Sequence, residues 1–126
     1  MQQLKLVRDG KRFKVSLTEQ VAELFEAVNA KERARCLKWL EMYAEDGPQH
    51  LDKTKLRNEG RFPVGNKAGT VISVLAFKAW QLRLYGGVVQ GNHFVATEID
   101  TSKKSDKADQ QLLRRAAKKL APFLPA

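Results

Sequence analysis

Apolar and polar residues alternate in two short stretches near the start of the chain, Leu4–Val7 and Arg12–Val15. A period of two places every second side chain on one face, as in a half-buried β-strand. Asp9-Gly10 lies between the two stretches and is typical of a tight turn in which both positions need a positive φ. The pattern predicts a small N-terminal β-hairpin, with one irregular strand as the alternative.

The spacing of apolar residues then changes to three and four, which is typical of helices. Ser16 and Glu19 have the spacing of a capping box, in which two side chains satisfy N–H groups at a helix start. A second helix is expected to end near Gly47-Pro48. The short connection between the two helices favours a helix hairpin. The apolar faces consist of Val21, Leu24, Phe25 and Val28 in the first helix, and of Cys36, Trp39, Leu40 and Tyr43 in the second.

The middle of the chain has a weaker pattern. Residues 48–70 are rich in Gly, Pro, Asn, Asp and Lys and are expected to be mostly irregular, with a short helical turn around Leu51–Leu56. Thr70–Phe77 is apolar and β-branched at first, but its periodicity does not distinguish a strand from a helix. Strict alternation returns at residues 80–85 and predicts a half-buried strand. Its core face would carry Trp80, Leu82 and Leu84, and its polar face Gln81, Arg83 and Tyr85.

The last part of the chain predicts a further strand and a helix. Gly86-Gly87 and Gln90-Gly91-Asn92 are turn signals, and Phe94–Ile99 is expected to be a strand. Asp106 is the expected N-cap of a terminal helix. The apolar positions of that helix are Leu112, Leu113, Ala116 and Leu120.

The order of these elements predicts one α+β domain over residues 1–126, with residues 1–15 as an additional N-terminal β-hairpin. Strands joined by short turns pair antiparallel. The expected fold is therefore a small antiparallel β-sheet with the N-terminal helix hairpin packed on one face, followed by a C-terminal helix.

Charge is distributed unevenly along the chain, whose net charge is +9. Residues 1–63 hold 13 basic and 10 acidic residues, whereas residues 64–126 hold 10 basic and 4 acidic ones. The second half is therefore the expected contact surface for a polyanion such as RNA. The chain has no apolar run long enough for a membrane span and no apolar secretory segment at its start, so we expect a cytoplasmic protein.

Several kinds of chemistry have little support in the sequence. The two histidines, His50 and His93, and the one cysteine, Cys36, lack metal-ligand spacing, so no metal site is expected. Cys36 lies on an apolar helix face, where a buried free thiol is a common small core residue. Glu98 and Asp100 alternate on one strand and are interpreted as a solvated face that balances nearby lysines.

The cations are the remaining candidates. Arg83 and Tyr85 share a strand face, where a guanidinium can bind phosphate oxygens and a phenol can stack on a base or donate a proton. An ion pair of Arg83 with Asp100 or Glu98 is an equally weighted alternative. Lys103 and Lys104 end the last strand and could position a phosphate, or could simply be solvated. The terminal helix carries the further cations Arg114, Arg115, Lys118 and Lys119.

Three short motifs carry a family resemblance. They are the strand WQLRLYGG, the later strand ending in TSKK, and the helix spacing Ala108–Ala116-Ala117. In this order they resemble RelE/HigB-type toxins, especially the phage-derived Gp49-like branch, over residues 20–120. The resemblance implies a small antiparallel sheet with two packed helices and a metal-independent endoribonuclease that cuts messenger RNA on the ribosome. It also implies a cognate antitoxin, often a helix-turn-helix protein, and no small-molecule cofactor.

The same resemblance assigns roles to residues. Arg83 corresponds to the strand arginine of the family, Lys103 and Lys104 to its lysine pair, and Lys78 to an additional basic residue. These side chains would assist attack of the substrate 2′-hydroxyl on the adjacent phosphate. Tyr85 and His93 are weaker candidates for proton transfer, and Lys78, His93, Arg114 and Lys118 are expected to contact RNA. The alternatives are a non-catalytic, phage-derived basic module that binds RNA or protein, and a gyrase-directed toxin of the same superfamily.

Overall fold

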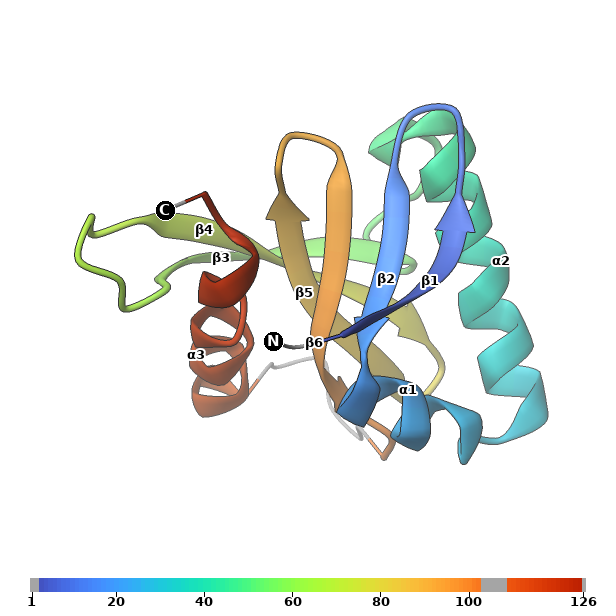
Figure 1. Ribbon diagram of the computed structural model, residues 1–126. Helices are drawn as coiled ribbons and strands as arrows, with labels where there is room; N and C mark the ends of the chain where they lie inside the picture. The colour runs from blue at the N-terminus through green and yellow to red at the C-terminus, as the bar shows by residue number, and fades with distance from the viewer. Residues whose placement is uncertain (1–2, 103–108, 126) are drawn as a thin grey trace.

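A computed structural model describes residues 3–102 and 109–125 and contains one six-stranded sheet with helices on both of its faces (Figure 1). The strands lie in the order β1-β2-β6-β5-β4-β3. The elements in chain order are β1 (Leu4–Asp9), β2 (Lys14–Thr18), α1 (Glu19–Glu26), α2 (Ala30–Asp46), η1 (Pro48–His50), β3 (Leu56–Pro63), β4 (Val71–Ala79), β5 (Leu82–Val89), β6 (His93–Asp100), α3 (Gln110–Lys118) and η2 (Ala121–Phe123).

The α+β class is confirmed, but the sheet is mixed rather than antiparallel. Four pairs of strands are antiparallel, as expected for strands joined by a turn or loop: β1–β2, β3–β4, β4–β5 and β5–β6. The exception is β2, which pairs parallel with β6, so that Val15 lies opposite Phe94. β2 and β6 are far apart in sequence, so no short turn dictates their direction.

The two N-terminal helices cover one face of the sheet and α3 covers the other. α1 contacts β1, β2 and β6, whereas α2 contacts β1, β2, β4 and β5, and the two helices run in different directions in Figure 1. Their buried side chains pack on Phe77, Leu82, Leu84 and Phe94 of the sheet. On the opposite face, the four apolar positions predicted for the terminal helix are all buried. The sheet is therefore the middle layer of three.

Covering both faces changes the environment of β5. Leu82 and Leu84 face the first core as predicted, but Tyr85 lies in a second core with α3 rather than on a polar face. Trp80 is not a core residue: it lies in the turn between β4 and β5 and is 53% exposed. Gly86-Gly87 lies inside β5 and forms no turn. Glycine is needed at position 86 because a Cβ there would lie 2.0 Å from the carbonyl oxygen of Val95.

Other local predictions were partly right. The N-terminal hairpin is present, yet Gly10 is needed for space rather than for a positive φ, since a Cβ there would lie 2.4 Å from the carbonyl of Ala44 in α2. α1 is capped by Thr18 instead of Ser16, which belongs to β2.

Two further predictions concern the middle and the end of the chain. The segment expected to be irregular contains β3. The short helical turn expected around Leu51–Leu56 is present as a single turn, in which the N–H groups of Lys55 and Leu56 both donate to the carbonyl of Asp52 at 2.9 Å. α3 begins after the N-cap Asp109. The expected N-cap, Asp106, lies outside the described residues.

Candidate functional site

The site is built at the end of the sheet where β4 turns into β5. Lys78 and Arg83 are opposite each other in the antiparallel register, one residue pair before the turn formed by Trp80 and Gln81. Opposed residues on neighbouring antiparallel strands point to the same face. The family resemblance therefore singled out two cations that are neighbours in space.

Arg83 is held by the backbone of its own hairpin. Its Nη1 donates hydrogen bonds to the carbonyl of Leu82 at 3.0 Å and to the carbonyl of Trp80. The residue is 8% exposed, and the β5–β6 register places Asp100 opposite it, as the ion-pair alternative requires. Because the guanidinium is anchored at two carbonyls, its position at the rim of the sheet is well defined.

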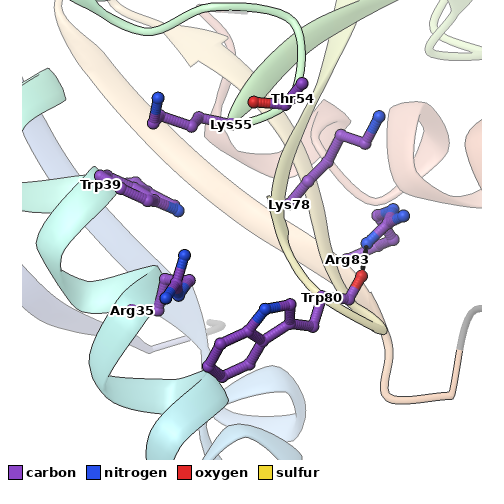
Figure 2. Close-up of a pocket in the computed structure, with 7 residues that line it drawn as sticks. All are labelled: Arg35, Trp39, Thr54, Lys55, Lys78, Trp80 and Arg83. Atoms are coloured by element: carbon purple, nitrogen blue, oxygen red, sulfur yellow. Dashed lines mark hydrogen bonds between the residues drawn. The ribbon is translucent and has the colours of Figure 1, made fainter.

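A cavity of about 440 Å³ opens beside this hairpin (Figure 2). α2 contributes Arg35 and Trp39 to its wall, and the segment before β3 contributes Thr54 and Lys55. The remaining wall consists of Lys78, Trp80 and Arg83. The backbone N–H of Lys78 donates to the carbonyl of Lys55 at 2.8 Å, which fixes that segment against β4.

Two tryptophans, the only ones in the chain, line this cavity. The guanidinium carbon of Arg35 lies 4.2 Å from the ring centroid of Trp80, and Nζ of Lys55 lies 5.2 Å from that of Trp39. Both distances are within the range of cation–π attraction. The indoles and the cations therefore form one mixed surface.

The cavity has a positive electrostatic character. Four of its seven lining residues are cations, and within the described part of the chain none is acidic. Two carboxylates lie close by: Asp52 contacts Nζ of Lys55 at 3.2 Å, and Glu32 accepts a hydrogen bond from the backbone N–H of Gln81 at 2.8 Å. Hydrogen bonds from Thr54 and then from Lys55 lower the pKa of Asp52, so this carboxylate stays charged and offsets part of one cation. A net positive surface remains.

Tyr85 does not line the cavity. Its side chain is 1% exposed and packs with Val74, Ala76 and the buried side of α3. Burial raises the pKa of the phenol to about 12, with smaller contributions from neighbouring charges led by Asp100. A phenol in this environment has no access to substrate and holds its proton firmly.

His93 lies at the other end of the sheet. It opposes Val89 on β5, six residues from Arg83, which is a separation of about 20 Å along the strand. Its Nε2 is 2.7 Å from the hydroxyl of Ser16, and burial, followed by the charge of Lys14, lowers its pKa. The histidine joins β2 to β6 and does not reach the cavity.

Two of the remaining predicted residues also lie away from the cavity, and two lie outside the described chain. Arg114 and Lys118 are exposed on α3 and are absent from the cavity wall. Their neighbours Arg115 and Lys119 pair with Glu98, the former at 3.9 Å. Lys103 and Lys104 lie outside the described residues.

Sequence patterns missed five members of this cavity. Trp39 and Trp80 were assigned to apolar core faces, and no role was given to Arg35, Thr54 or Lys55. The only sequence signal was the presence of two tryptophans in a basic chain, and these lie 41 positions apart. Their proximity depends on α2 packing next to the β4–β5 hairpin.

Other features of the described residues add no second reactive centre. Cys36 is fully buried, and burial raises the pKa of its thiol to about 12, as expected for a core residue. Among the residues that the structure describes, no group of three or more His, Cys, Asp or Glu side chains could hold a metal ion. The described helices include none that is long and apolar enough to cross a membrane. Comparisons with protein-family models, curated proteins and solved structures gave no match.

Proposed function

We propose that this protein is an RNA-directed toxin of the RelE/HigB type that cuts messenger RNA, and that the cavity beside Arg83 is its RNA-contacting surface. The observation that supports this proposal is the grouping of Arg35, Lys55, Lys78 and Arg83 around one cavity without an acidic lining residue in the described chain. Phosphate oxygens are bound well by guanidinium and ammonium groups, and such binding provides much of the affinity of proteins for RNA.

The expected reaction needs charge stabilisation more than metal chemistry. The 2′-oxygen of the RNA forms a bond to the adjacent phosphorus, and the bond from phosphorus to the 5′-oxygen of the next nucleotide breaks. The 2′-hydroxyl proton leaves to a base, and the departing 5′-oxygen gains a proton. Lys78 and Arg83 would offset the extra negative charge that the phosphate carries in the transition state. Lys103 and Lys104 remain candidates for the same role, because they follow Asp100, the register partner of Arg83, in sequence.

A non-catalytic RNA-binding module is the second candidate. It is favoured by the positions of Tyr85 and His93, because the first is buried under α3 and the second lies at the far end of the sheet. Neither can exchange a proton with a ligand in the cavity. This alternative predicts salt-dependent RNA binding without cleavage.

Induction of the protein in bacterial cells tests the first candidate. We expect growth arrest and new 5′ ends in messenger RNA, detected by primer extension, and relief on co-expression of an antitoxin encoded beside the gene. The double variant Lys55→Ala/Lys78→Ala should abolish the arrest. Lys11→Ala/Lys67→Ala removes the same charge from two exposed lysines away from the cavity and is the matched control.

The outcomes separate the candidates. Arrest by wild type and by the control, but not by the cavity variant, supports the proposed site. Equal arrest by all three proteins contradicts the site. RNA binding by the purified protein without new 5′ ends, even with translating ribosomes, favours the non-catalytic module.

A further inference from the structure

We propose that the same cavity binds one unpaired nucleobase of RNA by stacking against Trp39 and Trp80, with the attached phosphate against Lys78 and Arg83. This inference deepens the proposed function and rests on it in taking RNA as the ligand. The expected ligand is single-stranded RNA, because a paired base is stacked inside its own helix and presents no free face.

The backbone at Trp80 supports a role for its side chain beyond packing. Trp80 has φ 54°, in the left-handed region that a bulky residue occupies at a cost and that glycine adopts freely. The turn therefore forms despite the tryptophan rather than because of it. The indole is also 53% exposed, so burial does not compensate for the strain. Strained positions of this kind cluster at binding sites.

The arrangement of the side chains matches the two parts of a nucleotide. Figure 2 shows Trp39, Arg35 and Trp80 along one side of the cavity, with Arg35 between the two indoles, and Lys78 and Arg83 along the other side. Indole rings and the planar guanidinium of Arg35 are stacking surfaces for a base. The cations on the other side fit the phosphate. A volume of about 440 Å³ is suitable for one nucleotide.

Intrinsic fluorescence gives a direct test, because the only two tryptophans of the chain both line the cavity. The full-length protein is titrated with a single-stranded adenosine pentanucleotide RNA, with a blunt RNA duplex and with inorganic polyphosphate of the same net charge. We expect strong quenching by the single strand and little by the other two. Equal quenching by polyphosphate would overturn the stacking proposal, because that polyanion has no bases.

Two glycine variants distinguish the effect of losing the indole ring from the effect of relieving a strained turn. Trp80→Gly removes the indole and relieves the turn, whereas Gln90→Gly relieves the equivalent positive φ of 52° in the β5–β6 turn, away from the cavity. Trp80→Gly should weaken binding of the pentanucleotide by about 10- to 100-fold, as for loss of one stacked base, and leave polyphosphate binding unchanged. Gln90→Gly should bind both ligands like wild type. Unchanged pentanucleotide affinity in a folded Trp80→Gly protein would refute the inference.

The two proposals fail in different ways. Quenching by single-stranded RNA without growth arrest in cells contradicts the toxin and supports the nucleobase site. Growth arrest that Trp80→Gly and Trp39→Phe leave intact, with no quenching by the pentanucleotide, contradicts the nucleobase site and supports the toxin. Equal affinity for a deoxyadenosine pentanucleotide would overturn the assignment to RNA.

Discussion

The strain at Trp80 predicts an unusual order of stability for two small substitutions. Trp80→Ala and Trp80→Gly both remove the indole and its contact with Arg35, so their difference reports only the backbone. The left-handed conformation at φ 54° costs an alanine about 1–2 kcal/mol. Glycine avoids this cost but loses about 0.4–1 kcal/mol through the larger entropy of its unfolded chain. The glycine variant should therefore be the more stable, by about 0.8 kcal/mol at the centre of these two ranges.

Gln81 in the same turn is the matched control. It is exposed and its φ is not positive, so only the entropy of the unfolded chain separates its two variants. The free energy of unfolding of Gln81→Ala should exceed that of Gln81→Gly by about 0.4–1 kcal/mol. Urea unfolding followed by circular dichroism measures all four free energies of unfolding, and melting temperatures should follow with shifts of about 2–4 °C. The reasoning would be refuted if Trp80→Ala were as stable towards urea as Trp80→Gly, or more stable.

Three further predictions concern the core and the sheet. Gly86→Ala should destabilise the protein by at least about 3 kcal/mol or prevent folding, measured by urea unfolding, because its Cβ would lie 2.0 Å from the carbonyl oxygen of Val95. Cys36 should react with a thiol reagent only after denaturant is added, since it is fully buried, and rapid labelling of the folded protein would contradict its place in the core. Because the pKa of His93 is lowered on folding, the unfolded chain binds more protons, and stability should fall as pH drops below about 6.5. The measurement is the urea midpoint of each protein at pH 7.5 and at pH 5.5. Between these values His93→Gln should lose less stability than wild type. The control His50→Gln, at an exposed position, should lose as much as wild type.

The cavity depends on contacts that cross the whole chain. Glu32 at the start of α2 accepts a hydrogen bond from Gln81, which ties the β4–β5 turn to that helix. The segment before β3 is tied to β4 through the carbonyl of Lys55. The candidate site is thus a meeting point of a helix, a loop and a hairpin, and any change that shifts α2 should alter it.

Local patterns by themselves determined much of the secondary structure. The N-terminal hairpin, the two N-terminal helices, the strand at residues 94–99 and the buried side of the last helix were all predicted correctly, because periods of two and of three to four report directly which side of an element is buried. β3 was missed since it pairs only with β4, contains Gly60 and Pro63, and has an irregular register between Asn58 and Arg61. An exposed edge strand of this kind has little apolar alternation.

Only the tertiary structure decided which surfaces are open. Sequence alternation on β5 could separate Leu82 and Leu84 from Arg83 and Tyr85, but it could not show that α3 covers the second face and buries Tyr85. Tertiary packing also determined the parallel pairing of β2 with β6 and brought Trp39 close to the β4–β5 hairpin that carries Arg83. These features join residues far apart along the chain, and such contacts follow from how the layers pack rather than from any local pattern.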